Sequence, residues 1–159
     1  MEWAEVLADP VLQDLPYKIE LNEYGKIVMS PASNRHSLLQ GDLIRLLGGK
    51  LPGRVFPECS IQTTKGVKVA DVVWCSVDFI RRYNFTTPYP HAPELCVEIV
   101  SPSNSQQELA EKIVLYLVAG AREVWIVFED GQIEIHDASG RLERSALLHP
   151  ITLELSILF

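Results

Sequence analysis

The sequence lacks the long apolar run that a membrane-spanning helix requires. None of its segments approaches the roughly 20 consecutive apolar residues needed to cross a bilayer. The opening segment, Met1-Glu-Trp-Ala-Glu5, has neither the positive charges nor the apolar core of a signal peptide. These absences predict a cytoplasmic protein with no membrane partner.

Cysteine is scarce, and positive charge is outnumbered. The three cysteines, Cys59, Cys75 and Cys96, include no CxxC pair, so we expect reduced thiols in the core and neither a zinc site nor a disulfide framework. The formal net charge is −7, with 14 Lys and Arg against 21 Asp and Glu. DNA affinity comes largely from neutralising phosphates, so this balance argues against a strongly basic nucleic-acid binder. It leaves room for a locally basic binding face.

Length and patterning predict one domain over residues 1–159, of the α/β or α+β class. Apolar residues make up 47% of the chain and charged residues 22%, which is ordinary for a folded domain. Periodicity and turn residues predict the following elements. They are a short helix at 3–9, a hairpin at 17–29, a helix at 35–48 stopped by Gly48-Gly49, short strands at 54–63 broken around Pro57, a strand at 67–74, a loop at 83–93, a strand at 95–100, a helix at 105–118, a hairpin at 122–136, and weak strands at 141–148 and 151–157.

Two carboxylates stand where strand patterns should place only apolar side chains. Asp71 lies within the run from Val67 to Trp74, and Glu98 lies within the run from Leu95 to Val100. Burying an unpaired carboxylate costs several kcal/mol or more, so such acids are usually neutralised, paired or bound to a metal. A helix bearing Lys112 follows the second strand. Together these residues suggest a divalent-metal site.

Ordinary structural roles are open for each of these residues. Asp71 could accept backbone hydrogen bonds at a strand end, and Glu98 could pair with an arginine. Lys112 could form a surface ion pair with Glu108, four residues before it. Glu20 alternates with Lys18, so a solvated strand face explains it as well as a ligand role does.

Electrostatics gives a further expectation for the carboxylate pair. Two clustered carboxylates repel without a cation, so at least one should have a raised pKa in the metal-free protein. On the same argument, Asp71→Asn should maintain or raise the stability of that protein.

An ordered set of short motifs resembles the Uma-two family of restriction-endonuclease-like proteins, a branch of the PD-(D/E)xK nuclease superfamily. The resemblance runs from about Tyr17 to Asp137. It is carried by Tyr17…Glu20…Gly25, His36 opening a helix, the Asp71 strand, Val97-Glu-Ile-Val-Ser-Pro102, Glu111-Lys112…Tyr116…Gly120 and Glu123-Val-Trp125. Two positions depart from the superfamily pattern. Val100 stands where a lysine usually lies, and Ala70 stands where the motif has proline.

The resemblance implies a restriction-endonuclease-like fold, with a central mixed β-sheet flanked by helices and an N-terminal β-hairpin. It implies Mg²⁺-dependent hydrolysis of DNA phosphodiester bonds, with Mn²⁺ as a substitute. The implied catalytic residues are Asp71, Glu98 and Lys112, with Lys112 replacing the usual strand lysine from the next helix. The implied metal ligands are Asp71, Glu98 and the backbone carbonyl of Ile99, with Glu20 as a further candidate. Supporting positions are Glu20, His36, Gln40, Glu108 and Tyr116.

Partner and activity have more than one interpretation. DNA is the expected partner, and a homodimer or higher homo-oligomer is expected because paired sites would cut two strands. The acidic pI of about 5.1 favours an alternative, a catalytically silent or weakly active nuclease-fold protein acting in binding or assembly. A metal-dependent phosphoesterase acting on small substrates also fits the residues.

Overall fold

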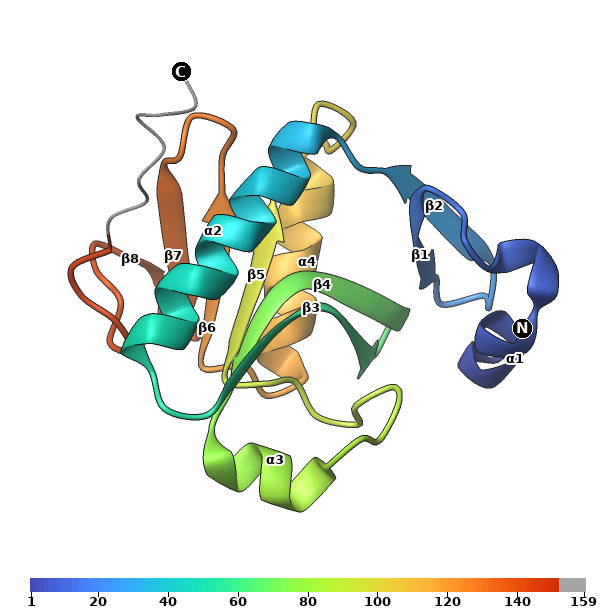
Figure 1. Cartoon of the computed structure of the whole chain (residues 1–159), viewed down its shortest axis with the longest axis horizontal. Coiled ribbons are helices and arrows are strands. Elements are labelled where there is room, and N and C mark those ends of the chain that lie inside the picture. The colour runs from blue at the N-terminus through green and yellow to red at the C-terminus, as the bar shows by residue number, and fades with distance from the viewer. Residues whose placement is uncertain (152–159) are drawn as a thin grey trace.

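The computed structural model describes residues 1–151, in which a six-stranded mixed sheet forms the centre of the molecule (Figure 1). Its strands follow the order β3-β4-β5-β6-β7-β8. Only β5 and β6 pair in parallel, and the other neighbours are antiparallel. The strands are β3 Arg54–Thr63, β4 Gly66–Cys75, β5 Leu95–Ile99, β6 Glu123–Val127, β7 Ile133–Asp137 and β8 Gly140–Leu142.

Two long helices cover opposite faces of this sheet (Figure 1). Helix α2, Asn34–Lys50, buries Leu39, Leu43 and Leu47 against one face. Helix α4, Gln106–Val118, packs Leu109 and Tyr116 on the other. The spacing of these residues by four or seven positions places each set on one side of its helix.

Side chains that alternate along the central strands contribute to the apolar cores on both faces of the sheet. In β4, Val72 and Trp74 face α2, whereas Val73 and Cys75 face α4. A strand buried on both faces reads as a continuous apolar run, and this is the pattern seen around Asp71.

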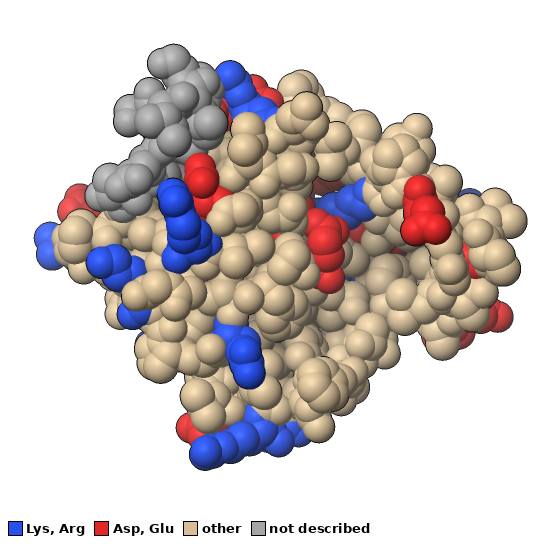
Figure 2. All heavy atoms as spheres, in the orientation of Figure 1, with Lys and Arg blue, Asp and Glu red and all other residues tan. Residues whose placement is uncertain are grey.

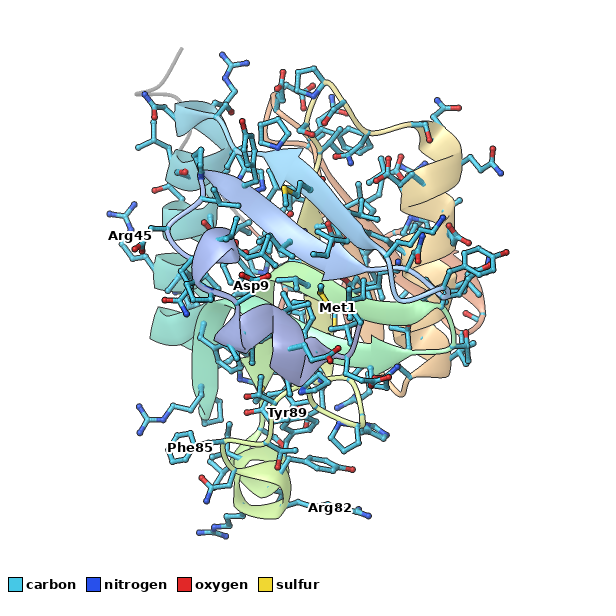
Figure 3. All side chains as sticks on the ribbon, turned by 90° about the vertical axis from the view of Figure 1, so that its right-hand side faces the viewer. Met1, Asp9, Arg45, Arg82, Phe85 and Tyr89 are labelled. Carbon is cyan, nitrogen blue, oxygen red and sulfur yellow. The ribbon has the colours of Figure 1, made fainter. Side chains whose placement is uncertain are left out.

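The N-terminal hairpin forms a separate two-stranded sheet beside the central one (Figure 1). It consists of β1, Tyr17–Leu21, and β2, Ile27–Pro31. Helix α1, Trp3–Ala8, and a short 3₁₀ helix, Pro10–Leu12, precede it. A third apolar cluster joins this unit to the start of β4, formed by Trp3, Val6, Leu21, Val67 and Val69. In Figure 3 the hairpin and α1 lie in front of β3 and β4.

The fold class predicted from the sequence is confirmed, with local corrections. Strand β3 runs continuously through Pro57 and is not broken there, because it lies at the sheet edge, where proline needs no ladder hydrogen bond on its outer side. The pairing lapses only at Glu58, which adopts a φ of 55°.

Helix and strand ends also differ from the expectation. Helix α2 passes through Gly48 and Gly49 to Lys50. Helix α3, Val77–Tyr83, was not predicted, although Ser76 caps it through the amide of Phe79. Of the strand expected at 141–148, only the β8 segment at 140–142 forms, and the strand expected at 151–157 lies almost wholly outside the described residues.

No helix within residues 1–151 combines the length and apolarity needed to cross a membrane. Cys59, Cys75 and Cys96 are buried free thiols. Burial raises the pKa of Cys75 to about 12, so its reactive thiolate is suppressed at neutral pH.

The β3–β4 turn gives a test of how closely the hairpin packs on the sheet. Gly66 has a φ of +83°, and a Cβ there would lie 2.4 Å from the backbone oxygens of Leu21 and Asn22. We expect Gly66→Ala to lower the free energy of unfolding by about 1–3 kcal/mol, the range for a strained backbone position. Chemical denaturation measures this change.

Gly41→Ala is the matched control. Gly41 lies within α2, and no atom lies within 4 Å of the position its Cβ would take. This change should stabilise the protein by about 0.5–1 kcal/mol because it removes a helix-interior glycine. Equal unfolding curves for Gly66→Ala and wild type would contradict the close approach of the hairpin.

Candidate active site

Asp71 and Glu98 come from adjacent strands and share one face of the sheet. In the β4–β5 register Val72 pairs with Val97, so the next pair along brings Asp71 opposite Glu98. Glu98 contacts Lys112 and Tyr116 of α4, and the Lys18 ammonium contacts both Glu98 and Asp71. Asp71 is 1% exposed and Glu98 is 3% exposed. Two adjacent core strands therefore carry a buried carboxylate pair.

Each oxygen of Asp71 has a partner. Oδ2 accepts a hydrogen bond of 2.7 Å from the backbone amide of Ile99. Oδ1 accepts one of 2.9 Å from Lys18 Nζ, and His36 Nε2 lies 3.3 Å from the same oxygen. The backbone of β5 and two side chains from outside the sheet thus fix this carboxylate.

Glu98 is held from helix α4 and from the hairpin. Its Oε1 accepts a hydrogen bond of 2.7 Å from the hydroxyl of Tyr116. Its Oε2 accepts two bonds of 3.2 Å each, one from Lys112 Nζ and one from Lys18 Nζ. Lys112 and Tyr116 are four residues apart, so the same face of α4 presents both groups.

The third carboxylate of the cluster is Glu20 in β1. Its Oε1 accepts hydrogen bonds from Lys112 Nζ at 2.9 Å and from the backbone amide of Val69 at 2.8 Å. Glu20 is 6% exposed, so it faces inward and does not lie on a solvated strand face. The Glu20 side chain therefore attaches the hairpin to β4, because it accepts the hydrogen bond that a neighbouring strand would otherwise accept from the Val69 amide.

Sequence reasoning missed Lys18, which is central to the cluster. Its ammonium lies 2.9 Å from Asp71 Oδ1, 3.2 Å from Glu98 Oε2 and 4.0 Å from Glu20 Oε1. The available signal was its spacing, because Lys18 is two residues before Glu20 and so shares its face of β1.

Of the other expected positions, Gln40 contacts the cluster and Glu108 does not. Gln40 Nε2 donates to the backbone oxygen of Asp71 and to Glu58 Oε1, both at 2.8 Å. Glu108 caps α4 in a reciprocal pair with Ser105. Within residues 1–151 it forms no ion pair with Lys112, whose ammonium turns to the carboxylates instead.

The electrostatics of the site reflect competition between burial and pairing. Burial raises the pKa of Glu98 above its usual range, which agrees with the expected raised pKa of one carboxyl group. Burial acts in the same direction on Asp71, but the Lys18 ammonium and the His36 hydrogen bond hold its pKa well below the ordinary value. The pKa of Glu20 is likewise lowered, because Lys112 and Lys18 outweigh the effect of burial.

The charge of His36 depends on the same carboxylate. Its hydrogen bond to Asp71 raises the pKa of the imidazole, against the opposing effect of burial. Nδ1 of this ring is buried and has no hydrogen-bond partner within the described part of the chain.

The site has oxygen donors suited to a hard cation. Within residues 1–151 no group of three or more acidic, histidine or cysteine side chains forms a ready-made metal centre. Carboxylates are nevertheless the ligands that Mg²⁺ prefers. The Lys18 ammonium stands in for such a cation, since it lies within hydrogen-bond distance of both Asp71 and Glu98. The donor set therefore fits a divalent ion at this position.

A mixed sheet between two helices, with buried carboxylates on adjacent strands and a lysine on the following helix, is compatible with a nuclease fold. The family model described as "Putative restriction endonuclease", Uma2, matches residues 4–157, and the chain belongs to this family. Among solved structures, the chain is similar to a "putative nuclease belonging to DUF820" from Anabaena variabilis, with a TM-score of 0.68 and 20% identity. The match covers 96% of this chain and 89% of that one. No protein with a curated description matches.

The pairing of Asp71 overturns one sequence expectation and yields a prediction. Asp71→Asn was expected to maintain or raise stability by relieving repulsion, but Lys18 already neutralises this carboxylate. We now expect this change to destabilise the metal-free protein by about 1.5–3 kcal/mol at pH 7, the range for a charged hydrogen bond. Denaturant unfolding at several pH values measures it.

The lowered pKa of Asp71 determines how its contribution to the free energy of unfolding changes with pH. The folded-state pKa of Asp71 lies below its unfolded value of about 3.9, so its contribution is present above that value and is lost as pH falls through the folded-state pKa. The gap between wild type and Asp71→Asn should narrow below about pH 4. Asp78→Asn, on a side chain that is 95% exposed, is the control and should cost at most about 1 kcal/mol. A stabilised Asp71→Asn protein would contradict the pairing.

Proposed function

We propose that this protein is a Mg²⁺-dependent endonuclease that hydrolyses DNA phosphodiester bonds and acts as a single domain. The observation that supports the proposal most directly is the convergence of Asp71, Glu98 and Lys112 at one buried cluster, in which Glu98 contacts Lys112 and shares the Lys18 ammonium with Asp71. Membership of the Uma2 family supports the same class of reaction. The buried free thiols are compatible with a reducing cytoplasm, where we place the protein.

The metal would be held by Asp71 and Glu98, with the Ile99 carbonyl and Glu20 as further candidate ligands. When bound, Mg²⁺ would polarise the phosphate and lower the pKa of an attacking water. The Ile99 amide holds one oxygen of Asp71, and Tyr116 holds one oxygen of Glu98. These bonds fix the direction in which the remaining carboxylate oxygens point.

Lys112 and His36 are the candidate groups for the phosphate and the water. The Lys112 ammonium is fixed between Glu20 and Glu98, where a positive charge would stabilise negative charge developing on the phosphate. His36 has one nitrogen on Asp71 and a second nitrogen, Nδ1, without a partner within residues 1–151. That nitrogen could bind a phosphate oxygen or a water.

Surface charge supports DNA as the substrate despite the acidic total. Figure 2 shows a hollow between the main body and the hairpin side of the molecule, with basic and acidic atoms at its mouth. Arginines and lysines are exposed on α2, at the start of β3 and on α3, and Figure 3 places Arg45 and Arg82 on two of these elements. Phosphate binding needs positive charge on the protein surface, and these side chains are the candidates for it. The residues are Arg45, Lys50, Arg54, Arg81 and Arg82.

One alternative is favoured by a specific observation. In the metal-free protein two lysines already compensate the three carboxylates, and a catalytically silent binding or assembly protein could keep such a cluster for stability. Incubation with plasmid, single-stranded DNA, RNA and a generic phosphodiester, with and without Mg²⁺ or Mn²⁺, separates the functions. Metal-dependent nicking of plasmid supports the endonuclease, cleavage of the generic ester alone supports a small-substrate phosphoesterase, and no cleavage supports the silent protein.

Lys112→Met tests the catalytic lysine while keeping most of the side-chain volume. Losing one well-placed electrostatic stabiliser typically lowers the rate by about 10²–10³-fold, and we expect a loss of this size in a plasmid nicking assay. Lys26→Met is the control, because Lys26 is exposed on the hairpin turn. Circular dichroism of both variants shows whether the fold survives. Near-wild-type cleavage by folded Lys112→Met would remove this residue from the site and direct attention to Lys65, Lys68 or Arg35.

Oligomeric state is a separate prediction. We expect a homodimer, because two copies of the site could cut both strands of a duplex and the described domain has no separate DNA-binding module. Strand β8 ends the described sheet, and a sheet edge can pair with another chain. Gel filtration with light scattering measures the mass, and a monomer at high protein concentration would contradict the dimer.

A further inference from the structure

Lys18 occupies an unusual position for a charged side chain of a peripheral hairpin. Its side chain is only 12% exposed, and its ammonium lies among Asp71, Glu98 and Glu20. Burial alone would lower the pKa of this lysine, but the surrounding carboxylates, Glu98 and Asp71 above all, hold it well above the usual value. The distances to the three carboxylates thus place a positive charge inside the cluster.

The oxygens that Lys18 binds are the ones that a bridging cation would need. Asp71 Oδ2 is taken by the Ile99 amide, and Glu98 Oε1 is taken by the Tyr116 hydroxyl. This leaves Asp71 Oδ1 and Glu98 Oε2, and the Lys18 ammonium donates to both. His36 Nε2 lies 3.3 Å from the first of these oxygens only, and Lys112 donates to the second only. Lys18 is thus the ammonium group that bridges the two carboxylates.

We propose that Lys18 is the resident cation of this carboxylate pair, and that a divalent ion binds only by displacing its ammonium group. The inference rests on the metal-dependent function proposed above. It makes Lys18 the residue that sets the metal affinity of the site. The exchange is chemically balanced, because one cation leaves the two oxygens as another takes them and no covalent bond changes.

The lysine can leave without unfolding the sheet that carries the ligands. Lys18 belongs to β1 of the separate hairpin sheet, whereas Asp71 and Glu98 belong to the central sheet. Its long, flexible side chain can move away from the two oxygens while Glu20 keeps β1 attached through Val69. Lys112, on the buried face of α4, stays in place and continues to neutralise the negative charges of Glu20 and Glu98.

Calorimetric titration of Mn²⁺ into the full-length protein tests the proposal. We expect Lys18→Met to bind Mn²⁺ about 10- to 100-fold more tightly than wild type, the factor that corresponds to one charge-assisted hydrogen bond. Lys26→Met, on the same hairpin with an exposed side chain, should bind as wild type does. The metal-free Lys18→Met protein should also melt at a lower temperature than wild type, and added Mn²⁺ should close that gap by mass action.

The outcomes separate this inference from the proposed function. Equal or weaker Mn²⁺ binding by Lys18→Met overturns the role of Lys18 and leaves metal-dependent cleavage standing. Absence of binding in both proteins overturns the metal dependence and, with it, this inference. Tighter Mn²⁺ binding by Lys18→Met, with Lys26→Met unchanged from wild type, supports displacement of the Lys18 ammonium by the metal.

A measurement on the wild-type protein covers the case in which Lys18→Met does not fold. Hydrogen-bonded lysine ammonium groups exchange their protons slowly enough to be followed by nitrogen-15 NMR of the side chains. The Lys18 signal, assigned by its loss in the charge-conserving variant Lys18→Arg, should lose its protection on Mg²⁺ saturation while that of Lys112 persists. A Lys18 ammonium that stays protected at Mg²⁺ concentrations that raise the melting temperature would overturn the proposal.

Discussion

The burial of two carboxylates between adjacent core strands is the constraint on which the rest of the structure depends. Asp71 and Glu98 are almost fully buried, and a buried charge without a partner costs several kcal/mol. The chain meets this cost with cations from both sides, Lys112 from α4 and Lys18 from the hairpin. The two elements that flank the site are therefore held in place by its charges as well as by apolar packing.

This constraint explains why a hairpin outside the main sheet belongs to the site. The β1–β2 unit has its own apolar cluster with α1 and the start of β4. Its polar connection comes from one face of β1, where Glu20 binds the Val69 amide and Lys112, and Lys18 binds the carboxylate pair. The hairpin contributes one charge of each sign, so its docking changes the net charge of the cluster very little.

Sequence periodicity made most of the helices and strands predictable. Which side chains meet in the carboxylate cluster was predictable only in part. The α2 and α4 helices, the hairpin and the Asp71 and Glu98 strands follow from local patterns that tertiary packing supports. Helix α3 was missed because its seven residues carry too short a pattern, and Gly48-Gly49 failed as a stop because both positions are exposed and open. Lys18 was missed because a lysine in a hairpin normally points to water. The spacing shows that Lys18 shares a strand face with Glu20, and the approach of β1 to β4 turns that face inward.

The charges of the cluster also bear on how an acidic protein could act on the DNA substrate proposed for it. Without metal, two ammonium groups nearly balance three carboxylates, so the site does not add appreciably to the repulsion that a net charge of −7 exerts on DNA. If a divalent ion takes the oxygens held by Lys18, as proposed above, the carboxylates remain neutralised and the displaced ammonium becomes available near the bound ion. The local field would then favour an approaching phosphate, although the total charge of the protein stays negative. A lysine that competes with metal in the resting state would thereby attract the substrate once the metal is bound.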